Sequence, residues 1–136
     1  DYGHHPTELE ATLRAAKSMN FNHVWAVFQP FTFSRTALLL DDFARVLKIA
    51  DKCVITAIMG SREKNTYNIY DKDLGNKVEG AVWFGDEQDH DRNFELCAEY
   101  VSSHAEEGDL ILTMGCGDIN KCAWLILDKL RARFGE

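Results

Sequence analysis

The amino-acid sequence predicts an α/β domain whose mainly parallel sheet is covered by helices on both faces. Two observations support this prediction. Along the chain, segments with the helical apolar period alternate with short, continuous apolar runs of strand length, which is the order of βαβ units. The length of 136 residues is typical of one domain, and the sequence contains no internal repeat and no linker. We therefore expect residues 1–136 to form a single domain.

The first helix is expected over residues 6–20, because apolar side chains recur there at positions i, i+4 and i+7. Thr7 and Glu10 have the S/T-x-x-E spacing of a capping box, which predicts that Thr7 caps this helix. The remaining elements follow the same alternation. In order, they are expected as a strand over 23–28, a helix over 35–50, a strand over 52–59, a short helix near 71–74, a strand over 80–85, a helix centred on 94–101, a strand over 109–114 and a closing helix over 118–134 that is apolar around most of its circumference.

Three loops follow the carboxyl ends of predicted strands, where open parallel sheets bind their ligands. Their sequences are QPFTFSRT (29–36), GSREKNT (60–66) and GCGDINK (115–121). We expect these loops to converge at one edge of the sheet.

The composition limits the classes of partner. The formal net charge of −7 disfavours duplex nucleic acid, because an acidic surface repels polyphosphate, whereas small anions can still bind locally. The apolar runs are too short to span a bilayer and no secretory leader precedes them, so we expect a cytoplasmic protein without a membrane partner. The cysteines lack C-x-x-C spacing and are expected as small buried side chains in a reducing compartment: Cys53, Cys97, Cys116 and Cys122.

Arg35 is expected near the start of a helix, next to hydroxyl groups and a proline. An arginine there can bind a carboxylate or a phosphate through two parallel hydrogen bonds. A solvated helix residue or an ordinary ion pair is the alternative interpretation. Phe31 and Phe33 are expected to pack against the domain rather than to stack on a ligand.

Gly115, Gly117 and Asp118 lie between a predicted strand and a predicted helix. Backbone amides at such a position can face an anion, but the segment is not a complete G-x-G-x-x-G fingerprint. Two interpretations therefore stay open, namely a tight turn with Asp118 as the helix N-cap and a loop that lines a site.

His4 and His5 immediately precede the first helix. Adjacent side chains on an extended chain point in different directions, and the sequence has no H-E-x-x-H spacing, so no metal site is expected. A structural and a catalytic role both stay open for these histidines. The sequence also lacks a nucleophile elbow and a Walker A motif, so this chain is not expected to catalyse a complete reaction alone. The other histidines are expected at strand edges or on the surface: His23, His90 and His104.

Four segments, DYGHHPTE, FQPFTFSRT, DDFARVL and LTMGCGDINK, together resemble the C-terminal domain of the Mur ligases over essentially the whole chain. The resemblance implies a Rossmann-like domain that closes over the active site and brings the incoming amino acid. It also implies that an N-terminal UDP-sugar-binding domain and a central ATP-binding domain lie outside this chain, which would be inactive by itself.

The implied chemistry is ATP-dependent amide formation during the synthesis of peptidoglycan precursors in the bacterial cytoplasm. In the family, the carboxylate of UDP-N-acetylmuramate accepts the γ-phosphoryl group of ATP, the amine of L-alanine attacks the acyl phosphate, and Mg²⁺ balances charge. The FQP…SRT stretch favours the alanine-adding member. Two alternatives stay open, namely a sister ligase that recycles murein tripeptide or uses another amino acid, and a free-standing nucleotide- or anion-binding module.

Matching positions carry the roles that the resemblance implies. Asp1 would contact the ATP ribose, while Tyr2, His4 and His5 would lie where ATP, acyl phosphate and alanine meet. Arg35 would hold the alanine carboxylate or the phosphate.

The GCGD segment and the FQP segment carry the remaining implied contacts. Gly115, Gly117 and Asp118 would line the same edge as nucleotide contacts. The family usually has a histidine after FQP, where this chain has Phe31. The alanine pocket is then either rebuilt with Thr32 and Ser34, or its contacts with the substrate differ.

Overall fold

The sheet is parallel throughout the part of the chain that the computed structural model describes, residues 5–85 and 89–135. Its four strands lie in the order β3-β2-β1-β4, and each neighbouring pair is parallel. Strand β1 therefore pairs with β2 on one side and with β4 on the other. The chain leaves β1 towards β2 and returns on the other side at β4, so the topological switch point lies where β1 and β4 end side by side. The strands are β1 (Val24–Phe28), β2 (Lys52–Ile55), β3 (Val82–Trp83) and β4 (Leu110–Met114).

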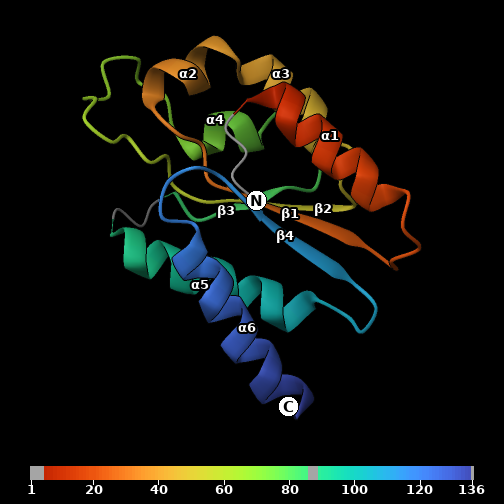
Figure 1. The fold of residues 1–136 in the computed structure, drawn as a ribbon. Helices are drawn as coiled ribbons and strands as arrows, with labels where there is room; N and C mark the ends of the chain where they lie inside the picture. Colours follow the sequence, from red (N-terminus) through yellow and green to blue (C-terminus); the bar gives the residue numbers. More distant parts are fainter. Residues whose placement is uncertain (1–4, 86–88, 136) are drawn as a thin grey trace.

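The helices form two layers, one on each face of the sheet (Figure 1). Helices α1 to α4 cover one face, and α5 and α6 pack together on the other. The three-layer α/β arrangement that the apolar pattern predicts is thus confirmed. The helices are α1 (Pro6–Lys17), α2 (Phe33–Leu38), α3 (Leu40–Leu47), α4 (Asp71–Gly75), α5 (His90–His104) and α6 (Asn120–Phe134).

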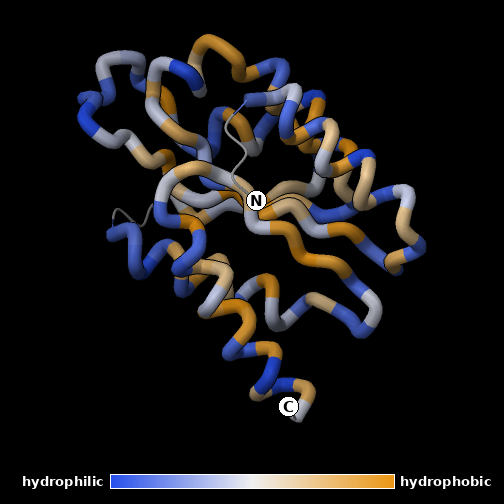
Figure 2. The backbone as a smooth tube through the Cα atoms, viewed as in Figure 1, coloured by the Kyte–Doolittle hydropathy of each residue, from blue (hydrophilic) through white to orange (hydrophobic). Residues whose placement is uncertain are grey.

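Strand β1 is buried along its whole length and separates two hydrophobic clusters. Ala26 and Phe28 belong to the cluster with α1 and α3, whereas Trp25 and Val27 belong to the cluster with α5 and α6. Alternate side chains of a strand point to opposite faces, so one strand supplies both cores. In Figure 2 the central strands are correspondingly orange over much of their length.

The start of α1 differs from the predicted capping box. His5, not Thr7, is the N-cap, and its Nδ1 accepts a hydrogen bond from the Thr7 amide at 3.2 Å. Pro6 occupies the first helical turn, where its missing N–H costs nothing and its fixed φ favours the helix. Glu10 pairs instead with Arg14 at 2.9 Å and with a residue of α3, so the predicted capping box is wrong.

The predicted helix over 35–50 is two helices. Thr32 caps α2, so the helical segment begins at Phe33, and it breaks at Leu39, where φ is −109° and ψ is 20°. The break allows both Leu39 and Leu40 to pack against the first cluster, while Leu38 is exposed.

The lengths of two strands and the burial of the closing helix also differ from the predictions. The predicted strands over 52–59 and 80–85 are shorter, because their loops leave the sheet after Ile55 and Trp83. The closing helix buries fewer of its apolar side chains than predicted, and Trp124 of α6 is 64% exposed. Of the described helices, none is both long and apolar enough to cross a membrane.

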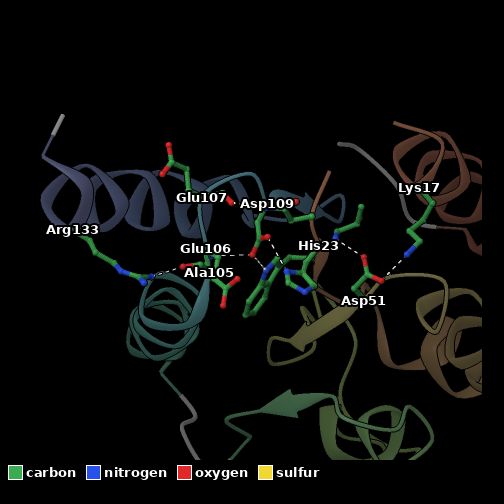
Figure 3. Close-up of polar contacts among 11 residues, drawn as sticks. Lys17, His23, Asp51, Ala105, Glu106, Glu107, Asp109 and Arg133 are labelled. Atoms are coloured by element: carbon green, nitrogen blue, oxygen red, sulfur yellow. Dashed lines mark hydrogen bonds and ion pairs between the residues drawn. The ribbon is translucent and has the colours of Figure 1, made fainter. Parts of the chain in front are cut away.

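A buried carboxylate ties the amino ends of β1 and β4 together (Figure 3). The side chain of Asp109 is 2% exposed and accepts hydrogen bonds from Trp25 Nε1 at 3.0 Å and from the Glu106 amide at 2.9 Å. His23 Nδ1 lies 3.0 Å from the other carboxylate oxygen. The partly exposed side chain of His23, just before β1, agrees with its predicted place at a strand edge.

A second aspartate joins β1 to the layer of α1. Asp51 accepts a hydrogen bond from the Val24 amide at 2.7 Å and pairs with Lys17 at 2.6 Å (Figure 3). Burial acts to raise the pKa of Asp51, but the hydrogen bonds from Lys17 and Val24 outweigh it, so the pKa is lowered. The amino edge of the sheet is therefore held by polar contacts within the chain.

Candidate functional site at the carboxyl edge of the sheet

The three loops predicted to converge do meet at the carboxyl edge. The loop after β1 binds the loop after β2, because the Thr32 amide donates to the Met59 carbonyl at 2.8 Å. It also binds the loop after β4, because Gln29 Nε2 donates to Asp118 Oδ1 at 2.9 Å. Residues far apart in sequence thus share one edge of the sheet, at its topological switch point.

Arg35 lies in the first turn of α2 at this edge. The Thr32 side chain caps the helix and accepts a hydrogen bond from the Arg35 amide at 3.3 Å. The Phe31 ring lies 6.0 Å from the Arg35 Cζ, within the range of a cation–π contact. The guanidinium is half-buried, yet it makes no hydrogen bond or ion pair with the residues that the structure describes.

Two of the predicted substrate-binding hydroxyls already have partners within the chain. Thr32 Oγ1 caps α2, and the Thr32 backbone has a φ of 63°, which is uncommon for a residue other than glycine. Ser34 donates to Glu63 through both its amide and its hydroxyl, at 2.9 Å and 2.5 Å. Both residues lie at the site, where their polar groups fix the first turn of α2.

The predicted packing role agrees with the structure for Phe33, whereas the Phe31 ring lies beside Arg35 and its backbone joins the loop after β2. Phe31 pairs with Met59 in an isolated parallel bridge next to β1 and β2. Phe33 packs so closely on Gly60 that a Cβ there would lie 2.4 Å from its ring. Together they join the first turn of α2 to the loop after β2.

The GCGD turn is shaped by a residue that the sequence did not single out, Gln29. Its side chain is fully buried, donates to Asp118, and leaves Oε1 without a partner among the described residues. A Cβ on Gly115 would lie 3.0 Å from the Gln29 carbonyl oxygen, and one on Gly117 would lie 2.6 Å from Gln29 Oε1. The sequence feature that could have drawn attention to Gln29 is its place as a polar residue directly after an apolar strand and before a proline.

Asp118 is not the N-cap of α6, contrary to one of the two predicted interpretations. The N-cap is Ile119, which makes no side-chain capping bond, and the Asp118 carboxylate instead accepts from Gln29. Lys121 Nζ lies 3.7 Å from its second oxygen. The aspartate therefore holds the loops after β1 and β4 together.

We expect Gly117→Ala to lower the free energy of unfolding by about 1–3 kcal/mol, because the new methyl group would overlap the buried Gln29 amide. Urea denaturation of the two proteins measures this change. In a Gln29→Ala background the closest of these contacts is removed and only Met59 Cγ, 3.0 Å from the added methyl, stays close, so the same substitution should cost clearly less. An equal cost in both backgrounds would contradict this explanation.

The start of α1 approaches the same edge of the sheet. Glu8, in the first turn of α1, and Arg35 both act electrostatically on the Cys116 thiol of the GCGD turn. His5 is exposed, and its Nδ1 accepts a hydrogen bond from the Thr7 amide, so in the neutral ring Nε2 carries the hydrogen. The structure thus gives His5 a structural role, and Asp1, Tyr2 and His4 lie outside the described residues.

The cysteines are free thiols, and three of them are buried as predicted. Burial raises the pKa of Cys53 and Cys122 to about 12 and also raises that of Cys97. Cys116 is half-buried, and burial raises its pKa against an opposing effect of Arg35. Only this thiol lies at the carboxyl edge of the sheet within the described part of the chain.

We expect Cys116 to react faster with a thiol reagent in the folded protein than the other three thiols, because it is half-buried whereas the others are buried and inaccessible. Time-resolved labelling followed by peptide mass spectrometry identifies the modified residue. A Cys116→Ser variant should lose the fast phase. Early labelling of Cys53 in the native protein would contradict this expectation.

These features define a class. The protein is an α/β domain whose loops after β1, β2 and β4 meet at the carboxyl ends of parallel strands, with the half-buried Arg35 among them. Residues 1–117 match the family model described as "Mur ligase, glutamate ligase domain". The chain belongs to this family.

Relatives with known names agree with this assignment. The chain is 46% identical over 129 residues to the UDP-N-acetylmuramate–L-alanine ligase of Caldicellulosiruptor saccharolyticus, covering 95% of this chain and 28% of that protein. It is 43% identical over 131 residues to the ligase of the same name from Acetivibrio thermocellus, covering 93% of this chain and 26% of that protein. The chain therefore spans about a quarter of the length of these relatives.

Solved structures share the fold. The UDP-N-acetylmuramate-alanine ligase of Thermotoga maritima matches with a TM-score of 0.72 at 20% identity, over 98% of this chain and 26% of that one. A murein peptide ligase of Psychrobacter arcticus matches with a TM-score of 0.67 at 20% identity, over 96% of this chain and 26% of that one. These similarities establish the Rossmann-like Mur ligase domain fold that the sequence resemblance predicts.

Proposed function

We propose that this chain is the amino-acid-binding domain of an ATP-dependent ligase that joins L-alanine to UDP-N-acetylmuramate. Family membership and the names of the relatives at 43–46% identity support this proposal. The observation in the structure that carries it is Arg35, a half-buried cation at the carboxyl edge without an acidic hydrogen-bond partner among the described residues.

Arg35 is suited to the carboxylate of the incoming amino acid. A planar guanidinium binds a carboxylate through two parallel hydrogen bonds, and the half-buried position strengthens this attraction. The Phe31 ring centroid lies 6.0 Å from the Arg35 Cζ, at the outer limit of a cation–π contact. The carboxylate would then direct the amine of L-alanine toward the activated muramoyl carboxyl group, so that the domain contributes position and exclusion of water.

ATP activates the muramoyl carboxylate when it is bound, and Mg²⁺ balances the phosphate charge. We assign both chiefly to the other domains of the ligase, as the resemblance implies. A Cβ added to Gly115 or Gly117 would contact Gln29. The packing of Gln29 explains why both positions are glycine, and Asp1, Gly115, Gly117 and Asp118 stay predicted nucleotide contacts.

The test is phosphate release by the full-length ligase with ATP, Mg²⁺, UDP-N-acetylmuramate and an amino acid. We expect turnover with L-alanine that exceeds turnover with glycine, serine or the murein tripeptide, and no turnover by this chain alone. A preference for tripeptide would favour the sister ligase, an alternative that the unusual Phe31 motivates. Turnover by the isolated chain would contradict the proposal.

A free-standing nucleotide-binding module is the candidate from another class, motivated by the Rossmann-like layout and the GCGD turn. Titration calorimetry of this chain with ATP and with NAD separates the two readings. We expect no tight binding of either nucleotide to the chain alone. Sub-micromolar affinity for NAD would support the module instead.

A further inference from the structure

We infer that Glu63 is a positioning residue, which holds the first turn of α2 so that Arg35 can receive the amino-acid carboxylate. This inference rests on the proposed function. Glu63 is half-buried in the loop after β2, and its two carboxylate oxygens accept hydrogen bonds from the Ser34 amide at 2.9 Å and the Ser34 hydroxyl at 2.5 Å. Both contacts fall on the residue directly before Arg35.

The loop that carries Glu63 is built to face α2. The Glu63 amide donates to the Gly60 carbonyl at 3.1 Å, which closes a tight turn, and Ser61 within this turn has a φ of 59°. The turn is pressed against the helix by the contact of Gly60 with the Phe33 ring. Glu63 therefore reaches Ser34 from a turn that is itself docked on the helix.

Helix α2 depends on such anchors because it has only six residues. A helix of this length is not stable in isolation, so contacts with neighbouring segments must fix its orientation. Thr32 and Glu63 supply two side-chain contacts to its first turn. Arg35 follows the backbone of this turn, and a shift of the turn moves the guanidinium.

The geometry leaves the guanidinium open to a ligand. Glu63 bonds to Ser34 and acts on Arg35 only through space, and the two charges nevertheless attract each other. The carboxylate thus anchors the helix without occupying the hydrogen-bonding edge of the guanidinium within the described contacts of Arg35. Because Glu63 bonds to Ser34 and not to the guanidinium, it acts as a positioning residue and not as an ion-pair partner of Arg35.

The test is steady-state kinetics of the full-length ligase with Glu63→Ala. We expect the KM for L-alanine to rise roughly tenfold, because a small displacement of a binding group is enough to cost that much. Glu63→Gln keeps an acceptor for the Ser34 amide and should restore most of the wild-type KM. Glu79→Ala, which removes an exposed glutamate from the opposite end of the sheet, is the matched control and should leave KM unchanged.

A double-mutant cycle shows whether Glu63 acts through Arg35. In an Arg35→Ala background, Glu63→Ala should raise the KM for L-alanine little further, since the group that it positions is gone. Independent effects that multiply would overturn the inference. So would an unchanged KM in Glu63→Ala, or equal rises in KM for alanine and for ATP.

A structural readout separates this inference from the proposed function. Hydrogen exchange of residues 31–38 should be faster in Glu63→Ala than in the wild-type and Glu79→Ala proteins, whatever the substrate. If the wild-type ligase shows no alanine-dependent turnover, the proposed function fails. If it turns over alanine and Glu63→Ala leaves both exchange and KM unchanged, the positioning role fails alone.

Discussion

Replacing Arg35 by alanine in the full-length ligase is expected to lower kcat/KM for L-alanine by roughly 30- to 1000-fold. This corresponds to the loss of about 2–4 kcal/mol of transition-state stabilisation, the usual effect of removing one well-placed polar partner from a partly buried site. The guanidinium has no acidic hydrogen-bond partner among the described residues, so its removal leaves no buried carboxylate unpaired. The loss should therefore appear in alanine kinetics and leave thermal unfolding nearly unchanged.

Two further variants make this expectation specific. Arg62→Ala removes an exposed arginine from the neighbouring loop and should leave the kinetics unchanged. Arg35→Lys keeps the charge but not the planar pair of donors, and should recover only part of the activity. An unchanged rate and an unchanged KM for alanine in Arg35→Ala would remove Arg35 from the site.

The fold could be predicted from the sequence because the apolar pattern is strong and local. The run His23 to Phe28 is too short for a helix of typical length and is rich in aromatic and β-branched residues, which fits a strand buried on both faces. The alternation of such runs with helices then leaves a parallel sheet as the natural arrangement. The meeting of the three loops follows from that topology.

The details that failed depend on tertiary contacts. The break at Leu39 falls within three successive leucines, and the apolar period alone reveals neither the break nor which leucine is exposed. His5 is the N-cap of α1 because Pro6 fixes where the helix begins. Asp118 has the sequence context of an N-cap but bonds to Gln29, a residue almost ninety positions away in the chain.

In the candidate site, too, the features set by local sequence could be predicted and those set by tertiary contacts could not. The position of Arg35 near a helix start could be predicted, whereas the lack of an ion pair between Arg35 and the described residues, and the contact of Glu63 with Ser34, could not. Whether a surface charge has a partner depends on the placement of a loop, and the loop after β2 has no periodic signal. Gln29 was missed for the same reason, since its role arises only where β1 and β4 end side by side.

Asp109→Ala is expected to have the largest effect on stability, lowering the free energy of unfolding by about 2–4 kcal/mol. The substitution removes a buried carboxylate and leaves the Trp25 Nε1 and Glu106 amide donors without their acceptor. It also loosens the junction of β1 and β4 at the amino edge (Figure 3). Urea denaturation measures the change, and Asp128→Ala, at an exposed position of α6, should change stability by no more than about 0.5 kcal/mol.

The same carboxylate should make stability depend on pH in a defined direction. Burial acts to raise the pKa of Asp109, but hydrogen bonds from the Glu106 amide, Trp25 and His23 outweigh it, so the pKa in the folded protein is lowered. A carboxyl group whose folded pKa lies below its unfolded value of about 3.9 stabilises the fold fully above that value and loses this stabilisation as the pH falls through the folded pKa. The stability difference between wild type and Asp109→Asn should therefore shrink as the pH falls below about pH 4. A difference that grows as the pH falls below about pH 4 would show that Asp109 is not held as a carboxylate by these three donors.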